Sequence, residues 1–308
     1  MVRKRFIAGG LLLLAFCALG GTFLIGTELM SPTQEKVGSP PRKLNAEDVE
    51  FRSQSGALLK GWLVRRPAEN GAVVLMHGIN TNRLTMLARA RFLADAGYSV
   101  LLFDFQSHGE SIGRHHTFGY LESLDARAAC EYLTSRLPNA NKGVIGTSLG
   151  GAAAVLGPGP LDVQALVLEA VYPTIEEATA NRIARRLGEP ARLLAPLLLW
   201  QLQPRLGVSA RQLRPIDRIG AIKAPLLLIA GGADEDTTPL ESRRLFRAAP
   251  DPKEYWEIAG AAHQDFYLYA PKEYETRVLA FLGRYLRSET ASGCRRTGRM
   301  MTFARLGS

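Results

Sequence analysis

Residues 146–150 read Gly-Thr-Ser-Leu-Gly and place Ser148 between two glycines, directly after the β-like stretch Lys142–Ile145. A serine on a sharp turn between a strand and a helix presents its hydroxyl as a nucleophile, and such a turn leaves little room for a Cβ at the flanking glycines. The small residues Gly-Ala-Ala-Ala at 151–154 agree with a helix that leaves the sheet at close range. Because this short pattern also occurs by chance, and Ser148 could instead cap a helix, the prediction of a nucleophile depends on catalytic partners.

Two candidate partners follow in the chain. Asp234 comes after the apolar run 226–229, and His263 comes after the β-like run 254–258. Because each follows a predicted strand, as Ser148 does, the three side chains should meet at the carboxyl edge of one sheet. The order serine, acid, histidine is typical of the α/β-hydrolases.

A fourth motif supplies hydrogen-bond donors. The apolar run Ala72–Met76 ends in His77-Gly78-Ile79, a turn that follows the third strand. Acyl transfer develops negative charge on one oxygen, which two preorganised backbone N–H groups can stabilise. We expect the amides of Ile79 and Leu149 to form this oxyanion hole, and the His77 side chain to be structural.

These motifs resemble the α/β-hydrolase superfamily over residues 45–287, and within it the small bacterial hydrolases of the serine-aminopeptidase and esterase type. The chain is also similar to Bem46-like proteins, which carry an N-terminal membrane anchor. The resemblance includes a loop at 103–111, in which Ser107 stands where the family usually has glycine. It favours Asp234 as the acid, because the family pattern is Gly-x-x-Asp, while Asp236 and Glu169 remain alternatives.

Strand-like and helical patterns alternate along residues 45–287, which is long enough for one complete core. Helical patterns such as Asn82–Ala96 and Tyr120–Arg136 separate the later strands, which indicates β-α-β crossovers. The sequence thus predicts an α/β-hydrolase fold with a mostly parallel eight-stranded sheet flanked by helices. The predicted strands are Val49–Arg52, Leu58–Val64, Ala72–Met76, Ser99–Phe103, Gly143–Ile145, Ala165–Leu168, Leu226–Ile229 and Tyr255–Ile258.

The alternation stops between two of these strands, and residues 173–220 are predicted to form a short helical cap. Its helical candidates are Ile175–Leu187 and Leu193–Leu202, and the second is almost wholly apolar. One interpretation is that this apolar face packs on the sheet domain. The other is an acyl-binding wall that includes Leu197, Leu198 and Trp200.

Residues 1–27 are predicted to be a transmembrane anchor or a signal peptide, because three basic residues precede the uncharged stretch Phe6–Thr27. As an anchor, this segment would leave the catalytic domain outside the cytoplasm and in contact with membrane lipid. Cleavage after residues 18–20 would give a secreted or periplasmic protein. Lipidation at Cys17 is a further alternative, but the bulky residue before it argues against this. Residues 28–44 are predicted to be an exposed linker.

The net charge of +9 is uneven. Residues 181–214 carry seven arginines and one glutamate, and the tail 288–308, predicted to be disordered, is also basic. The catalytic region is not basic, so no nucleic-acid partner is expected. We predict no cofactor and no metal, because His115 and His116 lack spaced ligand partners. The three cysteines do not suggest a disulfide, and Cys130 is expected to be a packing residue.

The predicted function is a membrane-tethered serine hydrolase that cleaves a small-molecule carboxylic ester through an acyl-enzyme. Thioesterase, lipase, peptidase and aminopeptidase activities use the same triad and stay open as alternatives. A different alternative is a membrane-tethered binding protein that kept the fold without turnover. The motifs specify neither the acyl length nor the oligomeric state.

Overall fold

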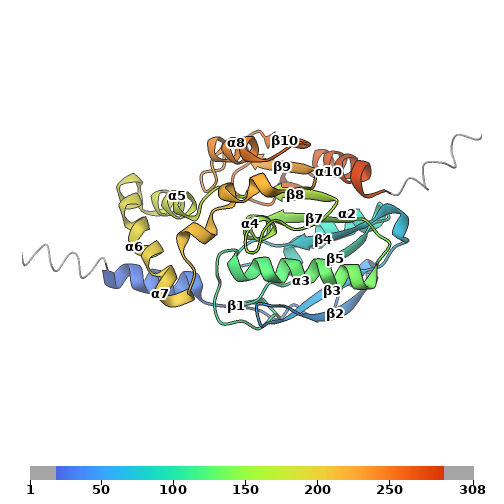
Figure 1. Ribbon diagram of the computed structural model, residues 1–308, viewed down its shortest axis with the longest axis horizontal. Helices are drawn as coiled ribbons and strands as arrows, with labels where there is room; N and C mark the ends of the chain where they lie inside the picture. Colours follow the sequence, from blue (N-terminus) through green and yellow to red (C-terminus); the bar gives the residue numbers. More distant parts are fainter. Residues whose placement is uncertain (1–18, 288–308) are drawn as a thin grey trace, which may run out of the picture.

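The computed structural model describes residues 19–287, and an eight-stranded sheet forms their centre (Figure 1). β2 pairs antiparallel with β3, and β3 with β5, whereas all other neighbouring strands in this sheet are parallel. The predicted mostly parallel eight-stranded sheet is therefore confirmed. In spatial order the strands are β10 (Lys253–Ile258), β9 (Leu226–Gly231), β8 (Ala165–Glu169), β7 (Lys142–Thr147), β4 (Ala72–Met76), β5 (Ser99–Phe103), β3 (Leu58–Val64) and β2 (Ala46–Arg52).

Helices cover both faces of the sheet, so the central strands are mostly apolar and buried. In β4, Val74 packs in the core beneath α3, α4 and α8, while Val73 and Leu75 face α2 and α10. A short 3₁₀ turn, Arg83–Met86, leads into α2. The helices over the sheet are α2 (Leu87–Asp95), α3 (Tyr120–Arg136), α4 (Leu149–Val155), α8 (Pro239–Ala248), α9 (Phe266–Tyr269) and α10 (Pro271–Leu286).

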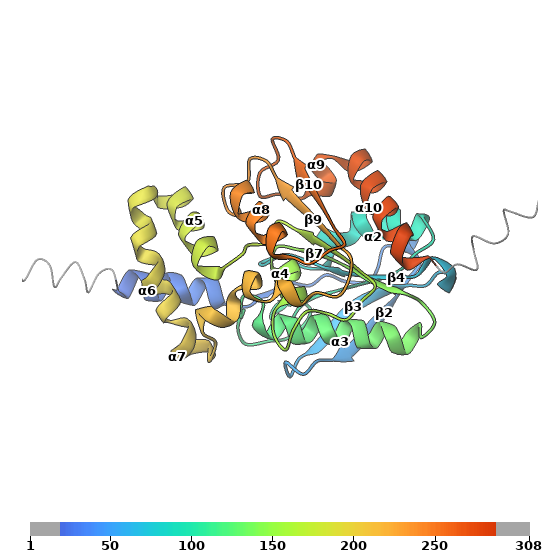
Figure 2. The same ribbon diagram turned by 45° about the horizontal axis from the view of Figure 1, so that its top comes forward.

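The cap lies between β8 and β9 and extends beyond one end of the sheet (Figure 2). It begins with α5 (Ile175–Leu187), as expected. The predicted helix Leu193–Leu202 is instead divided among a 3₁₀ turn, α6 and α7. Pro196 lies in the first turn of α6, where a proline needs no amide partner, so a new helix can begin there. These elements are Glu189–Leu194, α6 (Ala195–Trp200) and α7 (Leu202–Leu206), and 3₁₀ turns follow at Ala210–Leu213, Pro215–Asp217 and Ile219–Ala221.

Residues 19–30 form a helix that lies against the cap beside α6 and α7 (Figures 1 and 2). Residues 19–27 of the predicted anchor or signal peptide therefore belong to this docked helix. Within residues 19–287, no helix combines the length and apolar character needed to cross a membrane. Residues 1–18, with Cys17, and the predicted tail 288–308 lie outside the described residues.

The segment predicted as a linker, 28–44, is held along the loop after β5. Its short strand β1 (Thr33–Gln34) pairs in parallel with β6 (His108–Gly109). Farther on, the Val37 amide donates a hydrogen bond to Glu110 Oε1 at 3.2 Å. The chain between the N-terminal helix and the sheet is thus fixed to the domain, although many of its side chains are exposed.

Candidate active site

Ser148 occupies the turn between β7 and α4, with φ +50° and ψ −107°. This conformation is unfavourable for a residue with a Cβ and is maintained only because the surrounding structure imposes it. A Cβ at Gly150 would lie 2.5 Å from the carbonyl oxygen of Met76, and a Cβ at Gly146 would lie 2.7 Å from the backbone of Gly150. A side chain at either position would clash with the backbone, so both positions need glycine, as predicted.

His263 and Asp234 meet at the neighbouring strand ends, after β10 and β9. His263 Nδ1 lies 2.8 Å from one oxygen of the Asp234 carboxylate. The other oxygen accepts the amides of Asp236 and Thr237, both at 2.8 Å. These bonds fix the buried carboxylate and leave Nε2 of the imidazole for proton transfer. Within the described residues Ser148 makes no hydrogen bond to His263, and such bonds commonly tighten only when substrate binds.

The other two candidate acids have different partners. Asp236 pairs with Arg185, with 2.9 Å between Oδ1 and Nε. Glu169 is fully buried and pairs with Arg89 at 2.8 Å. Neither carboxylate contacts His263 in the part of the chain that the structure describes. Asp234 therefore lies beside the imidazole, whereas Asp236 and Glu169 form ion pairs with arginines.

The His-Gly turn is braced by the side chain of His77. The Nδ1–H of His77 donates to the carbonyl oxygen of Gly78 at 2.7 Å, and Nε2 accepts the amide of Phe105 at 3.1 Å. Burial lowers the pKa of His77 to about 4, so the ring is neutral at pH 7. Ile79, at the end of this turn, and Leu149, the first residue of α4, both line the cavity that contains Ser148. Because Leu149 begins a helix, its N–H has no partner within that helix.

In the loop after β5, Ser107 stands at a left-handed backbone position, the conformation that glycine adopts most easily. Ser107 adopts φ +65°, and its hydroxyl donates to the carbonyl oxygen of His115 at 3.1 Å. His116 is buried in the same loop, where its ring stacks on that of His108. Among residues 19–287 there is no cluster of histidine, cysteine, aspartate or glutamate side chains that could hold a metal ion.

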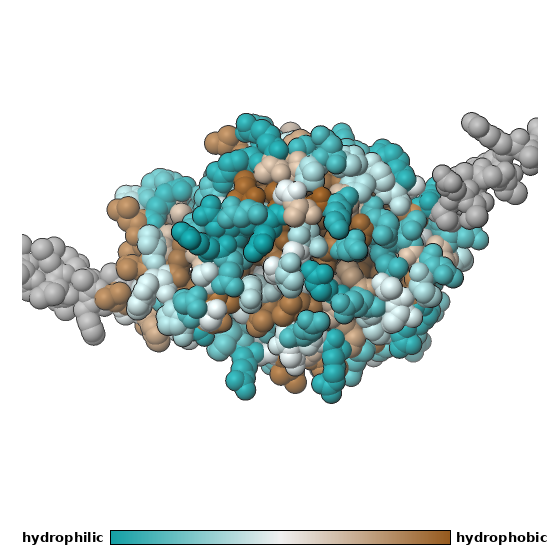
Figure 3. Space-filling model, in the orientation of Figure 1, coloured by the Kyte–Doolittle hydropathy of each residue, from teal (hydrophilic) through white to brown (hydrophobic). Residues whose placement is uncertain are grey.

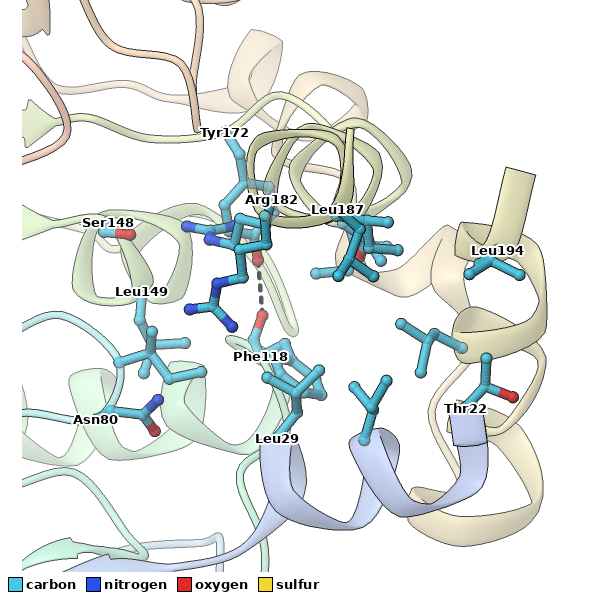
Figure 4. Close-up of a pocket in the computed structure, with 17 residues that line it drawn as sticks. Thr22, Leu29, Asn80, Phe118, Ser148, Leu149, Tyr172, Arg182, Leu187 and Leu194 are labelled. Carbon is cyan, nitrogen blue, oxygen red and sulfur yellow. Dashed lines mark hydrogen bonds between the residues drawn. The ribbon is translucent and has the colours of Figure 1, made fainter. Parts of the chain in front are cut away.

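A cavity of about 350 Å³ extends from Ser148 toward the cap (Figure 4). Leu198 lines it, but Leu197 is not part of its wall, and Trp200 is 71% exposed. Side chains two residues apart on a helix point in nearly opposite directions, because each residue turns the helix by about 100°. Of the three cap residues predicted to bind substrate, only Leu198 is placed to do so.

The cavity has walls that the sequence analysis did not predict. Thr22, Ile25 and Leu29 of the N-terminal helix line it on the side opposite α5 (Figure 4). Arg182 of α5 also points into it, between Ser148 and Leu29 in the view of Figure 4. Residues from three distant segments thus surround the space in front of the serine.

The comparisons with known proteins agree with this architecture. Residues 73–277 match the family described as Alpha/beta hydrolase family. Protein Rv2307c of Mycobacterium tuberculosis is 33% identical over 248 residues, which cover 79% of this chain and 80% of the relative. The alpha/beta hydrolase domain-containing protein WAV2 of Arabidopsis thaliana is 26% identical over 303 residues, which cover 88% of this chain and 94% of that protein.

Solved structures show the same fold. The esterase Pf2001 of Pyrococcus furiosus superposes with a TM-score of 0.68 at 23% identity, covering 84% of this chain and 98% of the esterase. The esterase EaEST of Exiguobacterium antarcticum gives a TM-score of 0.56 at 14% identity, covering 77% of this chain and 99% of that structure. The match over residues 73–277, together with the sheet topology and the serine turn, shows that this chain belongs to the alpha/beta hydrolase family.

Proposed function

We propose that this protein is a serine hydrolase that cleaves carboxylic esters through an acyl-enzyme at Ser148. The observation that carries the proposal is the strained serine turn in the wall of a mostly apolar cavity, with the His263–Asp234 pair at the neighbouring strand ends. Two solved structures of the same fold are described as esterases, which supports the ester as the substrate class.

In the proposed reaction, Nε2 of His263 takes the proton of the Ser148 hydroxyl as its oxygen attacks the ester carbonyl. The negative oxygen of the tetrahedral intermediate accepts hydrogen bonds from the amides of Ile79 and Leu149. Collapse breaks the bond to the alcohol, which receives the proton from His263. Water, deprotonated by the same imidazole, then attacks the acyl-enzyme and releases the carboxylic acid.

The charges around the cavity favour an ester over the free amino terminus of a peptide. Arg182 and Arg186 line the cavity, and no aspartate or glutamate is among its described lining residues. An aminopeptidase must bind an ammonium group, and this cavity presents two arginines and no lining carboxylate to such a group. We therefore rank the aminopeptidase second.

We also propose that the protein acts at a membrane, tethered by its N-terminal segment with the catalytic domain outside the cytoplasm. Its support is the uncharged sequence 6–18, which precedes the docked helix in the chain, and the apolar surface at the cap end of the molecule (Figure 3). Exposed apolar patches of this kind mark contact with partners or lipid. The exposed large apolar side chains on the N-terminal helix and cap are Leu19, Phe23, Leu24, Ile25, Leu187, Leu193 and Trp200.

Rates on p-nitrophenyl esters and on peptide p-nitroanilides test the proposed chemistry, together with labelling by a fluorophosphonate probe. We expect labelling, and ester cleavage at least a hundredfold faster than amide cleavage. Faster amide cleavage would make the protein a peptidase. Absence of both labelling and turnover in a folded preparation would leave the binding-protein alternative.

A further inference from the structure

The N-terminal helix, residues 19–30, contributes one face to the cavity in front of Ser148. Thr22, Ile25 and Leu29 line the cavity, and their spacing of three and four residues places them on the same side of the helix. Leu24, on another side, is 71% exposed. Figure 4 shows Thr22 and Leu29 facing the cavity from the side opposite α5.

Polar contacts fasten this helix to α6 and α7. Gln201 Nε2 donates to the carbonyl oxygen of Thr22 at 3.1 Å, and Arg205 donates to Thr27 Oγ1 at 2.7 Å. The Arg205 guanidinium also lies 4.6 Å from the centre of the Phe23 ring. The N-terminal helix approaches the cap so closely at Gly26 that a Cβ there would lie 2.7 Å from Gln201 Oε1.

The far end of the helix is fixed to the sheet domain. The carbonyl oxygen of Met30 accepts the amide of His116 at 3.0 Å, and Met30 is buried. The chain then enters β1, which pairs with β6. Because the helix is bound at the cap and at the domain, its cavity-lining side chains have defined positions relative to Ser148.

We infer that the N-terminal helix is part of the substrate site and that Ile25 and Leu29 contact the acyl chain of the ester. The inference rests on the proposed function and adds a specificity role to a segment outside the catalytic motifs. Each methylene buried against such a wall changes kcat/KM by about fourfold. The helix should therefore influence long acyl chains strongly and acetate very little.

Leu29→Trp in the full-length protein tests the inference, because the larger side chain would fill the space of the acyl chain. Leu24→Trp is the matched control on the exposed side of the same helix. With p-nitrophenyl acetate, butyrate and octanoate, we expect Leu29→Trp to lower the octanoate-to-acetate ratio of kcat/KM at least tenfold. Leu24→Trp should leave the ratio within twofold of the wild type.

An unchanged ratio in Leu29→Trp, with normal acetate turnover, would overturn the inference and leave the serine mechanism intact. If Leu29→Trp does not fold, Ile25→Trp replaces it, with the same expectation and the same contradicting result. Failure of the proposed function is distinguishable, because the wild-type protein would then show neither acetate turnover nor labelling by fluorophosphonate.

Discussion

At the residue scale, Asp234 is fixed by groups on both of its carboxylate oxygens. One oxygen lies 2.8 Å from His263 Nδ1, and the other accepts two backbone amides. Asp236, two residues later, pairs with Arg185 and supplies only its amide to this arrangement. Of the two neighbouring acids, only the Asp234 carboxylate is close enough to orient the His263 ring and stabilise its positive charge.

Replacement of each acid by asparagine separates these roles. We expect Asp234→Asn to lower kcat on p-nitrophenyl acetate by about 10⁴, because the amide would favour the wrong tautomer of His263. Asp236→Asn should lower kcat by less than about tenfold, since the Asp236 side chain does not contact the imidazole. The reverse order of effects would mean that Asp236 is the catalytic acid.

Much of the site could be predicted at this scale, because Ser148 and its partners follow recognisable strands. The choice of Asp234 depended on a family pattern, since a sequence does not show which carboxylate reaches His263. The position of Ile25 and Leu29 in the cavity wall could not be predicted from the sequence, for a physical reason. Their apolar, helix-forming segment fits a membrane span as well as it fits a cavity wall.

At the scale of elements, the turn between β7 and α4 depends on close packing of backbone. A Cβ at Gly150 would approach the Met76 carbonyl oxygen to 2.5 Å, and neither strand nor helix can move without disturbing the buried sheet. In the His-Gly turn, a Cβ at Gly78 would meet its nearest neighbours only at 3.9 Å. The structure thus excludes a side chain at Gly150 and leaves room for a Cβ at Gly78.

We expect Gly150→Ala to lower the free energy of unfolding by about 3 kcal/mol or to prevent folding, because the clash is with backbone. Gly78→Ala should change it by no more than about 0.5 kcal/mol. Urea denaturation of both variants provides the measurement. Equal stability of the two variants would show that the serine turn has more room than the structure indicates.

The strands were predictable because their apolar, β-branched runs are bounded by clear breaks, and the observed bounds of β3, β4 and β5 equal the predicted ones. The prediction of one continuous helix over Leu193–Leu202 was wrong. Apolar composition alone does not reveal that a new helix begins at Ala195, with Pro196 in its first turn, or that the chain turns again before α7.

At the scale of the whole molecule, the cap and the N-terminal helix gather exposed apolar side chains at one end (Figures 1 and 3). The same cap region carries seven arginines against one glutamate at residues 181–214. Basic residues beside an anionic membrane surface contribute about 1 kcal/mol each to binding. An apolar surface with basic neighbours is consistent with the proposed location at a membrane.

Two leucine substitutions test this orientation. Leu193 on the cap is 83% exposed, and Leu268 on α9 is 68% exposed, away from the cap. We expect Leu193→Ser to weaken sedimentation with vesicles of phosphatidylserine and phosphatidylcholine, at unchanged melting temperature, and Leu268→Ser to have no effect. Equal sedimentation of the two variants would contradict a membrane-facing cap.

The proposed mechanism requires Ser148 to form a covalent acyl-enzyme. Intact-mass and peptide mass spectrometry after incubation with a fluorophosphonate probe measures this directly. We predict one added phosphonyl group per chain, located on Ser148, and no added mass in Ser148→Ala, whose circular dichroism should match that of the wild type. Labelling of Ser148→Ala to the same extent, or modification at another residue of the wild-type chain, would contradict the account.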